Sequence, residues 1–121
     1  MIPVARPSLT TKELNAIGKV IETGWLGMGS NTKDFEEKIK KQIGCKYAIA
    51  VNTGTSALHI ALDSFGIGNG DEVIVPSITF VASIQAILSV GAIPVFCESN
   101  NEDLLIDIED VKNKITEKTR A

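Results

Sequence analysis

The sequence predicts an α/β protein in which parallel strands carry helices on both faces. Three short apolar runs rich in β-branched residues occur at 47–51, 72–76 and 94–98, and two segments of helical length lie between them, at 55–65 and 79–90. Strands that are apolar on both faces and alternate with helices are typical of βαβ units. The pattern therefore predicts a parallel sheet that is covered on both sides.

The first part of the chain predicts an extended arm and two helices. Thr10 and Glu13 have the spacing of a capping box, and apolar residues follow them at helical spacing. After the glycine-rich stretch "GWLGMGS", Ser30 or Asn31 can cap a second helix, which Gly44 ends. Both helices are expected to bury an apolar stripe.

The domain boundary is expected where the pattern changes. We expect residues 1–45 to form the arm and two helices, and residues 46–121 to begin an α/β domain. Three parallel strands would leave at least one long edge unpaired, and another strand should follow the last helix, which Asp107 caps. We therefore expect the chain to be the front part of a larger protein.

Composition excludes several classes of function. The chain has 121 residues and a formal net charge of −3, with acidic and basic residues interspersed. This balance gives no basic patch that would bind nucleic acid or an anionic membrane surface. In addition, no run of residues is long and apolar enough to span a bilayer. Cys45 and Cys97 are far apart in the sequence, so we expect two buried, reduced thiols in a cytoplasmic protein, with no disulfide and no metal site.

The stretch "NTGTSA", residues 52–57, joins the first predicted strand to a helix. Gly54 lets a ligand approach the backbone, and the first amides of a helix have no intrahelical partners. Such a corner at the carboxyl end of a parallel strand suits a phosphate. The alternative is that Thr53, Thr55 and Ser56 only cap the helix, and this stretch alone leaves the two interpretations equal.

Other phosphate motifs are missing, and one aromatic residue stands near the corner. The sequence contains neither a P-loop nor the G-x-G-x-x-G fingerprint, so a general nucleotide-binding domain is disfavoured. Phe80 lies in "PSITF", after the second predicted strand. Adjacent parallel strands end at the same edge of a sheet, so its ring could cover a flat heterocycle. Taken singly, Phe80 is better explained as a core residue.

Three stretches together carry a family resemblance. They are "GWLGMGSNTKDFEEKI", "YAIAVNTGTSALHIAL" and "GDEVIVPSITFVASIQAILSVGAIPVF". In this order and spacing they closely resemble the DegT/StrS family of sugar aminotransferases. The resemblance implies the N-terminal portion of the large domain of a fold-type I pyridoxal-phosphate enzyme. It also implies a homodimer with shared active sites, and a small C-terminal domain that is absent from this sequence.

The resemblance also implies site residues. Cofactor-binding positions would be Gly54, Thr55 and Ser56, which hold the phosphate of pyridoxal 5'-phosphate, and Phe80, which stacks on its ring. Substrate-binding positions would be Trp25, Leu26 and Gly27. The Schiff-base lysine and the aspartate at the ring nitrogen lie beyond Ala121 in the family. The chain by itself is therefore expected to be inactive.

The implied reaction moves an amino group, commonly from L-glutamate, to a nucleotide-linked keto-sugar, for amino-sugar biosynthesis. Two alternatives stay open. One is a pyridoxal-phosphate sugar dehydratase of the same family, in which a histidine replaces the lysine. The other is a regulatory or interaction module that keeps the fold without the chemistry.

Overall fold

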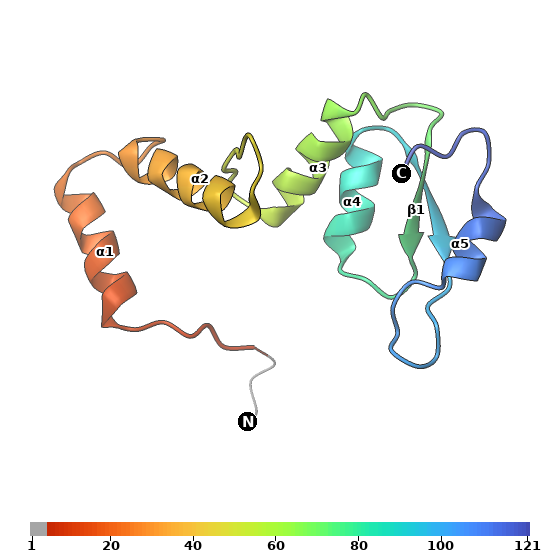
Figure 1. The fold of residues 1–121 in the computed structure, drawn as a ribbon, viewed down its shortest axis with the longest axis horizontal. Coiled ribbons are helices and arrows are strands. Elements are labelled where there is room, and N and C mark those ends of the chain that lie inside the picture. The colour runs from red at the N-terminus through yellow and green to blue at the C-terminus, as the bar shows by residue number, and fades with distance from the viewer. Residues whose placement is uncertain (1–4) are drawn as a thin grey trace. The chain divides into compact units, whose positions relative to one another are not determined.

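The structure is a computed structural model that describes residues 5–121 (Figure 1). The chain divides into two compact units, Met1–Ala50 and Val51–Ala121. The first four residues of the predicted arm lie outside the described part. No helix among the described residues is long and apolar enough to cross a membrane.

The first unit contains α1 (Thr11–Glu22) and α2 (Ser30–Ile43). The predicted capping box is confirmed, because the Thr10 N–H donates to Glu13 Oε2 at 2.6 Å and the Thr10 hydroxyl caps the helix in return. The prediction of a side-chain cap on α2 is wrong. Gly29 takes the N-cap position and makes no side-chain hydrogen bond. Gly44 ends α2 in the left-handed conformation, as predicted.

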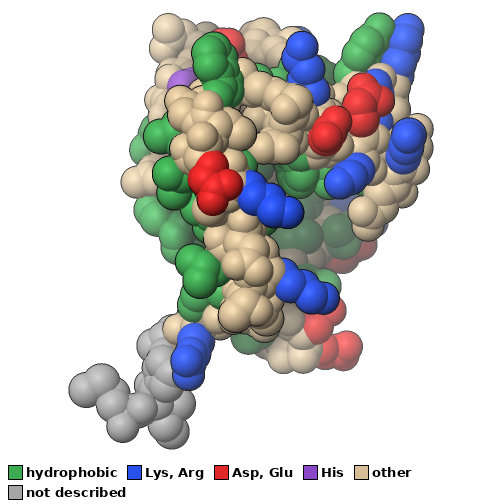
Figure 2. All heavy atoms as spheres, turned by 90° about the vertical axis from the view of Figure 1, so that its left-hand side faces the viewer, with side chains coloured by type: hydrophobic (Ala, Val, Ile, Leu, Met, Phe, Trp, Pro, Cys, Tyr) green, Lys and Arg blue, Asp and Glu red, His purple; other side chains and the backbone are tan. Residues whose placement is uncertain are grey.

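The apolar stripes of α1 and α2 are exposed, which differs from the prediction. Neither helix has a buried residue, and the side chains concerned are all more than half exposed: Leu14, Ile17, Ile21, Phe35 and Ile43. Figure 2 shows hydrophobic side chains open to the viewer beside charged ones. Exposed apolar stripes of this size are typical of surfaces that other protein covers.

The loop between α1 and α2 holds the only tryptophan of the chain in a defined position. The indole Nε1–H of Trp25 donates to the carbonyl of Met28 at 3.1 Å, and the Trp25 amide donates to Thr23 Oγ1. A Cβ at Gly29 would lie 2.9 Å from Trp25 Cδ1, so only glycine leaves room for the ring. Trp25 is nevertheless 65% exposed.

The second unit runs α3 (Gly54–Ser64), β1 (Glu72–Pro76), α4 (Val81–Ser89), β2 (Ile93–Cys97) and α5 (Ile108–Lys114). The strands pair in parallel, with Val73 opposite Pro94. Figure 1 shows α4 on one side of the strand pair and α5 on the other. The predicted α/β class, with parallel strands between helices, is therefore confirmed. The buried core consists of Ile67, Val73, Val75, Ile87 and Ala92.

The predicted first strand is wrong as secondary structure. Residues 47–51 form no ladder with any described residue, and Ile49 is 78% exposed. An extended segment becomes a strand only when a neighbour pairs with its backbone, and apolar composition cannot supply that neighbour. In contrast, the end of the chain does pair with β1. The Ile74 amide donates to the carbonyl of Ala121 at 2.9 Å, and Thr119 bridges in parallel to Glu72.

The two cysteines differ from each other. Cys97 is buried at the end of β2, as predicted, whereas Cys45 is exposed. The Cys45 thiol donates to the carbonyl of Tyr47 at 3.1 Å. The prediction of a buried thiol is therefore confirmed for Cys97 and wrong for Cys45.

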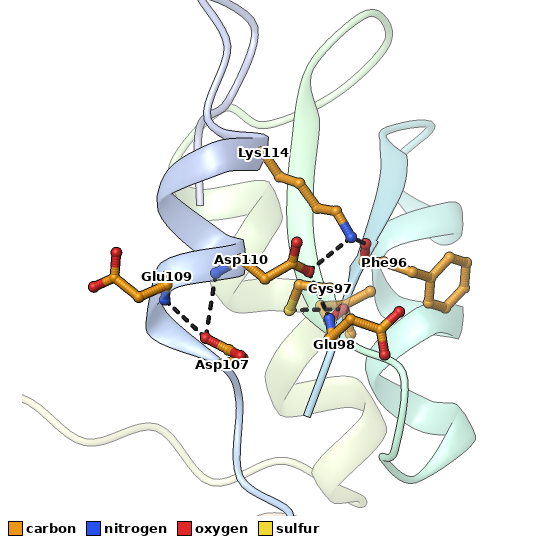
Figure 3. A network of polar contacts seen from close by, with 8 residues as sticks. Phe96, Cys97, Glu98, Asp107, Glu109, Asp110 and Lys114 are labelled. Carbon is orange, nitrogen blue, oxygen red and sulfur yellow. Dashed lines mark hydrogen bonds and ion pairs between the residues drawn. The ribbon is translucent and has the colours of Figure 1, made fainter. Parts of the chain in front are cut away.

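A polar clamp fastens α5 to the end of β2 (Figure 3). The carboxylate of Asp110 accepts from the Glu98 amide and from Lys114 Nζ, each at 2.7 Å. Lys114 Nζ also donates to the carbonyl of Phe96 at 2.7 Å. Asp107 caps α5 by accepting from the amides of Glu109 and Asp110, as the sequence predicted. The clamp fixes the chain where it leaves the sheet.

The clamp predicts an acid-sensitive contribution to stability. The hydrogen bond from Lys114 and then the Glu98 amide lower the pKa of Asp110. A carboxyl whose pKa is lower in the folded state stabilises the fold above its ordinary pKa of about 3.9, and this contribution is lost as the pH falls through the lowered value. We expect Asp110→Asn to flatten this acid dependence, as measured by urea unfolding followed by circular dichroism from about pH 6 to about pH 2. Equal pH dependence in the two chains would contradict the assignment.

The loop predicts an effect of a single methyl group on Trp25. Gly29→Ala should displace the indole, because the added Cβ would lie 3.0 Å from Nε1. We expect a changed emission maximum and a changed near-ultraviolet circular dichroism band for this only tryptophan. The matched control is Gly27→Ala, whose added Cβ meets Nε1 at 3.9 Å, an ordinary contact. Identical spectra for the two variants would show that the indole is not held as described.

Candidate functional site

The corner "NTGTSA" adopts the geometry of a capped helix start. Thr53 is the N-cap of α3, and its hydroxyl accepts from the Ser56 amide at 3.0 Å. The Ser56 hydroxyl donates to Asn52 Oδ1 at 2.8 Å and lies 2.9 Å from Thr53 Oγ1. The capping interpretation is thus correct for Thr53, and it engages both polar groups of Ser56.

Two amides of the corner stay uncommitted. Among the bonds of residues 5–121, the N–H groups of Gly54 and Thr55 have no acceptor, and the Thr55 hydroxyl has no partner. These donors lie in the first turn of an 11-residue helix, where the helix dipole is positive. The corner therefore offers two amides and one hydroxyl to an anion, and capping does not use them.

The approach to these amides is open. A Cβ built on Gly54 would meet no atom within 4 Å, so nothing in the described chain covers this backbone. Gly54 also has no positive φ, so its conformation does not require glycine. The physical use of glycine here is the free space in front of the amides, which a side chain would fill.

Phe80 stands at the start of α4. It is the N-cap residue of this helix, and the cap has no side-chain hydrogen bond. The residue is 77% exposed, so the interpretation of Phe80 as a core residue is wrong for this unit. An aromatic ring at this place is available to pack against another flat group.

The second unit brings the starts of α3 and α4 to the same end. Figure 1 shows both helices beginning at the end where β1 and β2 finish. Side chains near these starts share a cavity of about 340 Å³, to which Leu58 contributes from α3, Pro76 from β1 and Ser83 from α4. None of the four predicted cofactor residues lines it. The cavity therefore adjoins the two helix starts without including the phosphate corner.

The predicted substrate residues Trp25, Leu26 and Gly27 lie in the first unit. They line a cavity of about 530 Å³ together with the first turn of α2, including Ser30 and Asn31. Trp25 and Leu26 are 65% and 76% exposed.

Lys114 forms an ion pair with Asp110, with 2.7 Å between Nζ and Oδ2. The hydrogen bond to Asp110 raises the pKa of Lys114. A lysine that acts as a base needs the opposite change, a pKa lowered by its surroundings. Lys114 is therefore a structural cation.

Sequence reasoning missed the part that Asn52 takes in the corner. The available signal was an Asx residue at the end of an apolar run, four residues before a serine, because asparagine side chains commonly bond to nearby turns and helix starts. Asn52 fixes the direction of the Ser56 hydroxyl, so this hydroxyl must rotate before it can donate to an anion.

Comparison with known proteins gives consistent results. Residues 7–121 match the family model of the DegT/DnrJ/EryC1/StrS aminotransferases. The chain is 44% identical to GDP-perosamine synthase from Escherichia coli O157:H7, over 99% of this chain and 33% of the relative. GDP-perosamine synthase from Vibrio cholerae is also 44% identical, over all of this chain and 33% of the relative. The chain thus spans about a third of the length of these curated relatives.

Solved structures give the same result for the fold. A candidate sugar aminotransferase from Streptococcus pneumoniae, solved in PMP and PLP forms, matches with a TM-score of 0.91 and 33% identity. The match covers 98% of this chain and 30% of that protein. The backbone therefore follows the N-terminal portion of the large domain of fold-type I enzymes. On the sequence match and this fold, the chain belongs to the DegT/DnrJ/EryC1/StrS aminotransferase family.

Proposed function

We propose that the protein to which this chain belongs is a pyridoxal-phosphate-dependent aminotransferase that acts on a nucleotide-linked keto-sugar, with L-glutamate as amino donor. The observation that carries the proposal is the pair of uncommitted amides at Gly54 and Thr55 behind an open approach. Membership of an aminotransferase family supports it. The proposed role is amino-sugar biosynthesis in the cytoplasm.

The residues of the corner fit the phosphate of this cofactor. Gly54 and Thr55 would donate backbone N–H groups to the phosphate oxygens, and the Thr55 hydroxyl would add a third donor. Ser56 would join only after its hydroxyl turns away from Asn52. The positive end of the helix dipole favours the dianion further. No positively charged side chain is needed for this part of the binding.

Phe80 and the loop that contains Trp25 carry the other proposed binding groups. The exposed Phe80 ring is free to stack on the pyridine ring and to keep water from one face of it. Trp25, Leu26 and Gly27 would contact the substrate. When bound, pyridoxal phosphate supplies the electron sink for transamination. The lysine that carries it and the aspartate at its ring nitrogen are assigned to none of the described residues.

The substrate class is narrowed by the names of the curated relatives. Both relatives at 44% identity are GDP-perosamine synthases, and this supports a GDP-linked sugar as substrate. The protein would act as a homodimer with shared active sites, which would also cover the exposed stripes of α1 and α2. A sugar dehydratase of the same family is the second candidate, and the names of these relatives favour the aminotransferase.

The phosphate corner predicts the effect of a side chain at Gly54. We expect Gly54→Val to lower the affinity for pyridoxamine 5'-phosphate at least about tenfold, or about 1.4 kcal/mol, because the side chain fills the approach to the amides. This probe is fluorescent and forms no covalent link to lysines, so direct titration suffices. Gly18→Val is the control, since an added Cβ there also meets no atom within 4 Å. Unchanged affinity in a folded Gly54→Val chain would place the phosphate elsewhere.

The reaction itself is tested by nitrogen transfer. We expect the full-length protein, loaded with pyridoxal phosphate, to form at most one equivalent of 2-oxoglutarate per active site from L-glutamate alone, and to turn over repeatedly only when a GDP-linked keto-sugar is present to accept the nitrogen. The 121-residue chain alone should bind the cofactor without this activity. Loss of a sugar hydroxyl without nitrogen transfer would support the dehydratase. Cofactor binding without either reaction would support a non-catalytic module.

A further inference from the structure

Trp25 is exposed, yet its position is fixed. Its indole is tied to the carbonyl of Met28 and packed against Gly29, while 65% of the residue stays open to solvent. A buried tryptophan removes a large apolar area from water, so a loop that holds the ring outward gives up that gain. Such a ring is available to a ligand as a preformed flat surface.

The cavity beside Trp25 is lined by both apolar and polar residues. Its volume is about 530 Å³, within the range of small-molecule sites. Val20 and Leu26 extend the apolar wall that begins with the indole. The polar part of the lining includes Asn31 and Thr32 in the first turn of α2, and the side chains of these two residues make no hydrogen bond within residues 5–121.

The lining selects the chemistry of the occupant. Every lining residue is uncharged, so the cavity holds no side-chain cation to pair with a phosphate or a carboxylate. A nucleobase is neutral, has a π-face that stacks on aromatic rings, and has polar edges that bond to amide and hydroxyl groups. The free carboxamide of Asn31 can both donate and accept, which suits the mixed edge of a purine.

We propose that Trp25 stacks on the guanine base of a GDP-linked substrate and that Asn31 bonds to an edge of that base. The inference rests on the proposed function for the choice of a nucleotide-linked sugar. The assignment of the base, rather than the sugar or the phosphates, to this loop goes beyond the proposed function.

The test uses the tryptophan itself as the reporter. Because the chain has one tryptophan, its fluorescence reports on this loop alone. We expect GDP to quench the emission with saturation, and mannose 1-phosphate and pyrophosphate to leave it unchanged. By calorimetry, Trp25→Leu should weaken GDP binding about 5- to 150-fold, the range for loss of one base–aromatic stack, whereas Trp25→Phe should keep most of it.

Several results would overturn the inference. GDP could fail to quench, mannose 1-phosphate could quench as GDP does, or folded Trp25→Leu could bind GDP like the parent chain. Pyridoxamine 5'-phosphate is titrated on the same samples to separate this inference from the proposed function. Retained pyridoxamine phosphate binding without GDP binding at Trp25 refutes the base assignment alone. GDP stacking without pyridoxamine phosphate binding refutes the cofactor corner and leaves the base assignment standing.

Discussion

The parallel pairing of β1 with β2 is the constraint on which the second unit depends. Because the two strands run in the same direction, both finish at one end, and the chain needs a crossover between them to return to the other end. The crossover α4 covers one side of the pair, and the core forms between them, with Val73, Val75 and Ile87 as central members. The start of α4 therefore follows the end of β1, and α3 begins at the same end (Figure 1).

At the start of α3, which carries the candidate site, one residue caps the helix and its neighbours keep free amides. Thr53 caps α3 and engages the Ser56 amide, while the amides of Gly54 and Thr55 remain free. A cap that used every amide would give a more stable helix with no affinity for anions. The corner is therefore able to bind an anion because capping is incomplete, and the lack of a side chain at Gly54 keeps the free donors accessible.

In the first unit, local hydrogen bonds form the helix ends and the loop, but most of the apolar side chains are not buried. The helices α1 and α2 have well-formed ends, set by the capping box at Thr10 and the left-handed Gly44. Their apolar faces lack cover, and Trp25 is held outward by bonds within its own loop. Local hydrogen bonds thus determine the shape of this unit, while burial must come from contacts outside it.

Sequence alone determined the elements whose causes are local. It gave the helices, the caps at Thr10 and Asp107, the parallel α/β class and the family, because periodicity, capping residues and motifs are properties of neighbouring residues. The tertiary structure alone decided which apolar segments find partners. Residues 47–51 have strand composition but no neighbour, and Phe80 is apolar but exposed. It also decided which amides of the corner stay free, since a hydrogen bond depends on the positions of both groups and a sequence names only the groups.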